Sequence, residues 1–232
     1  MFNFINNFNF TNFIPIINIT LPFIFFGVID KITRKIIKWN ENENENDKNV
    51  YEISSRIYSS IHAGTVGIAS ILFLTIPSIP IERWSYVSSF TIGYALYDSI
   101  LLIKTKSSSY KQYLLHHIVM GYLSSIWRIN PSMAILGFTS ELSTPFLNFG
   151  WILWYKNKKR NGGYNRIIKI NSIIMLLLYF TTRIVNFTYI NFILYKHNQN
   201  VLPFTIFITL LNYFWFYKLM NLCICEKIKD KR

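Results

Sequence analysis

The chain has 232 residues, of which 51% are apolar and only 15% are charged. Soluble domains carry about 25% charged residues, so this composition argues against an ordinary soluble fold. The net charge of +13 would suggest a nucleic-acid partner if the basic residues formed one patch beside stacking aromatics. Their positions follow a membrane topology instead, and we expect no nucleic acid.

Long uncharged stretches indicate membrane-spanning helices. Charged residues are absent from residues 1–29, between Arg56 and Glu82, and between Lys196 and Lys218. A bilayer span needs about 20 apolar residues, and runs this long without alternation do not resemble barrel strands. We expect an all-α polytopic membrane bundle of about seven transmembrane helices. In chain order they are Ile14–Ile29, Ile61–Ile81, Trp84–Ile103, Tyr113–Trp127, Met133–Trp154, Ile170–Ile190 and Val201–Leu222.

The chain divides into three expected regions. Residues 1–55 hold the first span and a polar loop, residues 56–222 a domain of six spans, and residues 223–232 a basic tail. The loop contains the segment Asn40–Asp47, in which Asn alternates with acidic residues. Such a composition cannot bury a core, so it predicts a disordered loop. No basic region precedes the first span, which argues against a cleaved signal peptide.

The basic residues alternate between the segments that connect the spans. The segments that follow the first, third and fifth spans, together with the tail, hold 19 of the 24 Lys and Arg residues. The segments on the opposite side of the membrane hold 3. The positive-inside rule then places the amino terminus in the lumen and the carboxyl terminus in the cytosol, with anionic membrane lipids facing the basic side. Asn9 begins an Asn-Phe-Thr glycosylation sequon on the predicted luminal side.

Three charged residues fall well inside the expected spans: Asp98, Glu141 and Arg183. Intramembrane charges are costly unless paired or hydrated, so each is a candidate functional residue. Counting from the span ends at 1.5 Å per residue gives Glu141 and Arg183 the same depth, which predicts an ion pair. Such a pair either joins the fifth and sixth spans or anchors a lipid head group.

A second polar group is expected near the cytosolic surface, formed by Asp98, His116, His117, Asn148 and His62. A histidine near neutral pH can act as a general base, and Asp98 can orient it through the other ring nitrogen. The alternative is that His116 and His117 only hydrogen-bond between helices. Ligand-spaced carboxylates are missing, so we expect no metal site.

Pro145 lies inside the fifth expected span, on one helical stripe with Glu141 and Asn148. Its ring removes the backbone hydrogen bond to the carbonyl of Glu141 and should kink the helix. A kink leaves room for an acyl chain, although ordinary helix packing uses the same residues.

These segments together resemble the TLC family, which includes TRAM, Lag1 ceramide synthases and CLN8. The resemblance is carried by Arg56–His62, Gly93–Asp98, Leu115–Ile118, Glu141–Asn148 with Trp151, and Arg183. The block Glu141–Asn148 is most similar to the TLC domain-containing protein 4 group, also called transmembrane protein 56. The resemblance implies a TLC-type fold in the endoplasmic reticulum and a role concerned with lipids.

In ceramide synthases the paired histidines are active-site residues, a role that carries over only to His116 and His117. Two acidic positions of the synthase pattern are neutral here, at Thr144 and Asn148. We therefore expect a lipid-homeostasis protein that binds acyl-chain or sphingolipid-type lipids between its helices, with membrane lipids as partners and no cofactor. The alternative is a sphingoid N-acyltransferase that uses acyl-CoA, with His116, His117 and Asp98 as catalytic residues.

Overall fold

The computed structural model describes residues 16–40, 47–106, 110–126, 128, 130–159, 166–197 and 199–229, and the regular structure in these ranges is helical. The α-helices are α1 Ile16–Asn40, α2 Asp47–Thr75, α3 Trp84–Thr105, α4 Tyr110–Ser125, α5 Pro131–Phe138, α6 Thr144–Lys159, α7 Arg166–Tyr179, α8 Asn186–Lys196 and α9 Leu202–Lys229. Three short elements differ in winding: the 3₁₀ segments η1 Ile81–Arg83 and η3 Thr139–Ser143, and the π-helical segment η4 Phe180–Val185.

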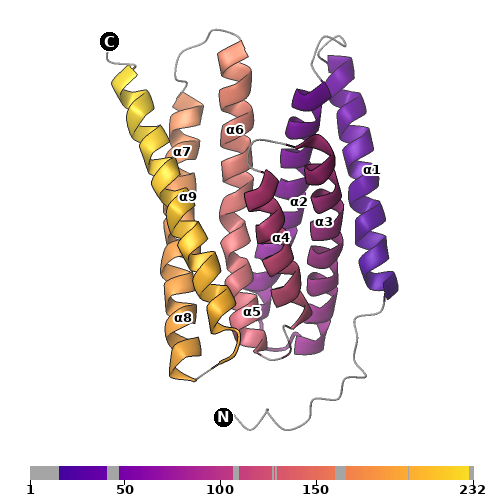
Figure 1. Ribbon diagram of the computed structural model, residues 1–232, viewed down its shortest axis with the longest axis vertical. Coiled ribbons are helices and arrows are strands. Elements are labelled where there is room, and N and C mark those ends of the chain that lie inside the picture. Colours follow the sequence, from indigo (N-terminus) through magenta and orange to yellow (C-terminus); the bar gives the residue numbers. More distant parts are fainter. Residues whose placement is uncertain are drawn as a thin grey trace.

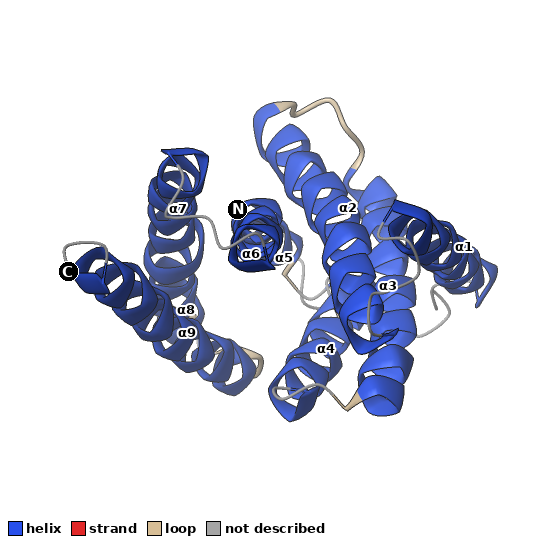
Figure 2. Ribbon diagram, turned by 90° about the horizontal axis from the view of Figure 1, so that it is seen from above, coloured by secondary structure: helices blue, strands red, loops and turns tan. Residues whose placement is uncertain are grey.

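The helices stand side by side as long columns (Figure 1). The elements α5, η3 and α6 follow one another without a loop and form one column, as do α7, η4 and α8. Seen end-on, α6 lies between the group of α1 to α4 and the group of α7 to α9 (Figure 2). It contacts α2 on one side and α7 on the other, so the interior between the two groups is lined from both.

Four stretches of the described residues are long and apolar enough to cross a membrane: Ile16–Trp39, Asp47–Thr75, Ile81–Thr105 and Arg166–Lys196. Many of their large apolar side chains are exposed, such as Ile24 and Ile100, as lipid-facing positions require. The protein is therefore an integral membrane protein with an all-helical fold in its described part. The expected number of seven spans stays a prediction.

The helix ends differ most from the expected span boundaries on either side of the predicted loop. Helix α1 continues to Asn40 instead of ending at Ile29, and α2 begins at Asp47 instead of Ile61. Hydropathy marks where side chains stop being apolar, whereas a helix continues as long as its backbone hydrogen bonds do. Lys38 Nζ lies 2.6 Å from Asp47 Oδ1 and links the two ends. The predicted loop was thus wrong at Asn40 and Asp47, and residues 41–46, like Asn9, lie outside the described residues.

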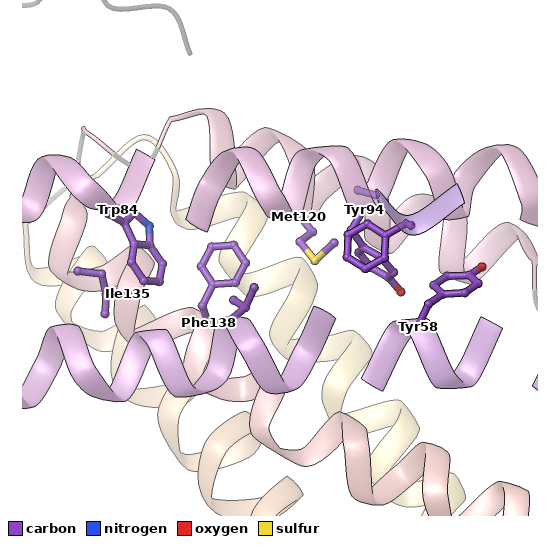
Figure 3. Close-up of a cluster of buried hydrophobic side chains, with 9 residues drawn as sticks. Tyr58, Trp84, Tyr94, Met120, Ile135 and Phe138 are labelled. Carbon is purple, nitrogen blue, oxygen red and sulfur yellow. The ribbon is translucent and has the colours of Figure 1, made fainter. Parts of the chain in front are cut away.

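The main apolar core lies between α1 to α5. Tyr58, Trp84, Tyr94, Met120 and Phe138 are buried in one cluster, and Figure 3 shows their side chains between neighbouring helices. Helix α1 reaches this core by packing closely on α3. A Cβ added to Gly93 would lie 2.7 Å from the carbonyl oxygen of Ile19 on α1, so the absence of a side chain permits the approach.

A buried carboxylate also holds α1 in place. Asp30 on α1 has no exposed surface, and it accepts hydrogen bonds of 2.7 Å from Ser54 on α2 and from Tyr97 on α3. Arg34 completes the cluster, with Nη2 2.7 Å from Asp30 Oδ2. Sequence reasoning missed this cluster because Asp30 immediately follows the expected end of the first span.

The basic segments gather at one end of the bundle. The end of α1, the start of α2, the end of α6 and the start of α7 lie together at the top of Figure 1. These ends carry Lys38, Lys48, Lys156 and Arg166. The alternation of basic residues along the sequence is therefore a separation between two ends in space. We call the top of Figure 1 the basic end.

Candidate functional site

A cavity of about 390 Å³ lies inside the bundle between the two helix groups. Near the basic end its wall includes Lys48, Glu52 and Lys218. Deeper in the bundle it is lined by polar residues from four columns: Asp98 from α3, His116 and His117 from α4, Glu141 from η3 and Arg183 from η4. The polar residues singled out by the sequence mostly face one interior space.

A second, narrower cavity of about 90 Å³ begins at the same polar level. The two cavities share four lining residues, the polar His116, Glu141 and Arg183 and the apolar Met120. The narrow cavity continues toward the other end of the bundle, where Asn130 and Val201 line it. Between these limits its wall is largely apolar: Met120, Leu123, Met133, Ala134, Gly137, Phe138, Phe187, Ile190, Leu194 and Ile208. We call the shared level, which also includes Asn212, the polar junction.

Asp98 and His117 meet on the wall of the wide cavity. His117 Nε2 lies 3.4 Å from Asp98 Oδ2, and both side chains are buried. Tyr58 donates a hydrogen bond of 2.5 Å to the other oxygen of Asp98, and Ser99 Oγ lies 3.5 Å from His117 Nδ1. This arrangement orients the imidazole from both ring nitrogens. Tyr58 had no assigned role in the sequence reasoning, because depth along a helix does not reveal hydroxyl partners.

His116 occupies a different environment from its neighbour. Its ring meets Trp215 of α9 edge-on, with the ring centroids 5.7 Å apart. Its Nδ1 atom is buried without a hydrogen-bond partner among the described residues. His116 lines both cavities, whereas His117 lines only the wide one. The two adjacent histidines thus divide between the polar junction and the Asp98 site.

Glu141 and Arg183 form the predicted ion pair, with Oε1 and Nη2 3.7 Å apart. Thr144 bridges them, because its hydroxyl accepts a 2.7 Å bond from Arg183 Nη2 and donates a 3.1 Å bond to Glu141 Oε2. Arg183 also donates to Ser143 Oγ at 2.9 Å and to Asn212 Oδ1 at 3.4 Å. The guanidinium therefore joins η3, η4 and α9 at one depth.

Irregular winding places both charges. Pro145 is the second residue of α6, where its missing N–H is tolerated, and the five residues before Thr144 adopt 3₁₀ winding. The 3₁₀ winding ends where α6 begins, one residue before Pro145, and the expected kink stays a prediction. On the facing column, Arg183 lies inside the π-helical segment η4, a winding that occurs frequently at functional sites. The side chain of Pro145 itself lines a separate groove of about 430 Å³ beside Phe146 and Ile170.

Asn148 holds an arginine at the wide cavity. Its Oδ1 accepts a 3.3 Å hydrogen bond from Arg56 Nη1, and its Nδ2 donates to Ser60 Oγ at 3.1 Å. The Arg56 guanidinium lies 4.0 Å above the ring of Trp151. Counting Arg56 with the cytosolic loop concealed its position inside α2, where it lines the cavity.

His62 does not join the other candidates. It is 1% exposed and stacks on Tyr94, with centroids 4.0 Å apart and ring planes at 10°. Its Nε2 lies 3.3 Å from Thr91 Oγ1. His62 is absent from the walls of the wide and narrow cavities, so it belongs to the core between α2 and α3. Within the described residues no three His, Cys, Asp or Glu side chains form a group that could hold a metal ion.

A model of the TLC domain matches residues 52–227, which is most of the chain. The chain belongs to the TLC family. The match begins inside α2 and ends in α9, so the columns that line both cavities fall within the TLC domain and α1 precedes it. No curated protein matches the chain.

Proposed function

We propose that this TLC protein binds acyl-chain lipids, including sphingolipid-type lipids, in the two adjoining cavities and serves lipid homeostasis. The observation that carries the proposal is the change in wall chemistry at the polar junction. The wide cavity exposes charged and hydroxyl groups, whereas the narrow cavity is largely apolar. Ligand sites of this kind combine an apolar wall with a few placed polar groups. An amphiphile matches this order, with its polar part in the wide cavity and its chain beyond.

Photoactivatable palmitic acid and photoactivatable sphingosine, offered separately to the purified protein in lipid nanodiscs, test this proposal. We expect adducts on residues of the cavity walls, such as Met120 and Phe187, that unlabelled ligand abolishes. Exposed positions of the same helices, such as Ile118 on α4, serve as the internal comparison. Adducts confined to these lipid-facing positions would reject a binding cavity.

A second candidate function is N-acyl transfer to a sphingoid base, favoured by the contact between Asp98 and His117 on the cavity wall. His117 would accept a proton as the amine attacks the thioester carbon of acyl-CoA. A C–N bond forms, the C–S bond breaks, and the departing thiolate takes up a proton. His116, with its unpartnered Nδ1, is the other candidate base in this reaction.

Purified protein supplied with palmitoyl-CoA and sphinganine distinguishes the two functions. The transferase requires release of free CoA and formation of the amide, both lost in His117→Ala and strongly reduced in Asp98→Asn. Tyr122→Ala is the control, because Tyr122 is an exposed aromatic of the same helix. Lipid binding without product in the unsubstituted protein would leave the non-enzymatic function standing.

We also propose that the protein resides in the endoplasmic reticulum, with its amino terminus in the lumen and its carboxyl terminus in the cytosol. Support comes from the basic end, since cytoplasmic segments are enriched in Lys and Arg. The similarity of Glu141–Asn148 to the TLC domain-containing protein 4 group supports the same compartment. A glycosylation acceptor fused to either terminus tests the orientation. Modification of a carboxyl-terminal acceptor would overturn it.

A further inference from the structure

Two buried polar atoms at the polar junction have no partner among the described residues: Nδ1 of His116 and Nδ2 of Asn212. The amide of Asn212 is oriented by its neighbours, because its Oδ1 faces the donors Arg183 Nη1 and Tyr179 OH, each at 3.4 Å. Its Nδ2 is thereby left as a free donor. An unmet buried donor or acceptor is unfavourable for the folded protein, and here both belong to side chains that line the narrow cavity. A polar group of a ligand at this level would satisfy them.

The narrow cavity limits what extends beyond that polar group. One buried water needs about 10–15 Å³ of cavity volume. The narrow cavity of about 90 Å³ therefore holds roughly six to nine groups of that size. A methylene is of similar size to a water. This is room for one hydrocarbon chain of about six to nine carbons, whereas two chains side by side could each enter by only about three to four carbons. The wide cavity of about 390 Å³ has no such restriction.

Gly137 on α5 lines the narrow cavity opposite α8. It precedes Glu141 by four residues, which places it about 6–8 Å beyond the polar junction at 1.5–2.0 Å per residue. A Cβ added there would lie 3.9 Å from Ile190 Cδ1 and from Phe187 Cζ, both on α8. A methyl therefore fits in ordinary contact, and a larger side chain must extend into the cavity or against α8.

Resting on the proposed function, we propose that the narrow cavity takes a single hydrocarbon chain whose polar end is bound by Asn212 and His116, and that Gly137 determines the length of chain admitted. The ligand class is accordingly a single-chain amphiphile, or a lipid that places only one of its chains here. A chain ending before Gly137 is unaffected by bulk at that position. A longer chain must pass it.

The test is a competition series in nanodiscs that contain the full chain. Photoactivatable palmitic acid is the labelled probe, and unlabelled saturated fatty acids from butanoic to eicosanoic acid compete with it. In Gly137→Leu we expect the affinity of the longer acids to fall by about tenfold or more relative to butanoic acid, which ends before Gly137, since several methylenes lose their burial. Ala134→Val narrows the same cavity and provides a second variant if Gly137→Leu fails to fold.

Gly121→Leu on α4 is the matched control. It adds the same side chain to a helical glycine, but nothing lies within 4 Å of a Cβ at this position. Its chain-length profile should match that of the unsubstituted protein. Asn212→Leu removes the free donor and should weaken the binding of butanoic and eicosanoic acid by similar factors, because it acts on the polar end.

The outcomes separate this inference from the proposed function. Specific labelling with an unchanged chain-length profile in folded Gly137→Leu and Ala134→Val would overturn the role of Gly137 and leave the binding function intact. Two photoactivatable palmitic acid molecules captured per chain on the wall of the narrow cavity would overturn the single-chain slot. Absence of any specific labelling of the unsubstituted protein would overturn both proposals.

Discussion

The ion pair between Glu141 and Arg183 offers a quantitative test by a double-mutant cycle. Arg183→Gln leaves a carboxylate that is 7% exposed with Thr144 as its hydrogen-bond donor. Leaving a buried charge without its partner costs about 3–5 kcal/mol of unfolding free energy. Glu141→Gln costs less, about 1–3 kcal/mol, because Arg183 keeps its bonds to Ser143 and Thr144.

The double variant contains neither charge, so it escapes the penalty of an unpaired ion. We expect its destabilisation to fall short of the sum of the two single changes by about 2–3 kcal/mol, the upper range for residues in direct contact. The unfolding free energy is measured in mixed micelles by titration with dodecyl sulfate and followed by helical circular dichroism.

The exposed pair of Lys38 and Asp47 is the control for this cycle. Its atoms are closer, at 2.6 Å, but the side chains are 49% and 73% exposed. Water and salt screen such pairs, so Lys38→Gln and Asp47→Asn should show no measurable coupling. The reasoning is refuted if the buried pair is additive within about 0.5 kcal/mol, or if the exposed pair couples as strongly as the buried one.

Three further substitutions, the first with a matched control, probe separate contacts, each by thermal unfolding of the purified protein. Gly93→Ala should lower the unfolding temperature by displacing α1 from α3, whereas Gly121→Ala should leave it unchanged or raise it through better helix propensity of about 0.5–1 kcal/mol; equal effects would contradict the close approach. Tyr58→Phe should cost about 1–3 kcal/mol because Asp98 loses a buried donor, and an unaltered stability would mean that another group replaces the hydroxyl. Thr144→Val keeps the side-chain shape but removes the bridge between the two charges; it should destabilise the protein by about 1–3 kcal/mol and abolish part of the coupling measured above.

The depth of a residue along a helix was predictable, and its direction around the helix was not. The rise per residue is constant, so counting from span ends was sufficient to bring Glu141 and Arg183 to one level. Direction depends on which neighbours a helix packs against. His62 was grouped with His117 by depth, but α2 turns it toward Tyr94 and away from the cavities.

Residues in polar stretches were harder to place than those in apolar runs. Asp30 and Arg56 were assigned to a loop because the segment between them is rich in charged residues, yet both are parts of long helices. Arg56 is kept in the interior by Trp151 and Asn148, which follow it by more than 90 residues. Only the fold reveals such distant partners. The alternation of basic segments, by contrast, needed no partners and predicted one basic end.

The anchoring of Asp30 has a consequence for how the protein is made. Its hydrogen-bond donors Ser54 and Tyr97 are on α2 and α3, so a ribosome must synthesise 97 residues before the last of them is part of the chain. A carboxylate inside a membrane helix is costly while it lacks partners. The first helix therefore gains its full stability in the bilayer only with the next two, and these three form the earliest unit of the nascent chain in which every partner of Asp30 is present. A chain interrupted after α2 would hold this acid with Arg34 and Ser54 but without Tyr97.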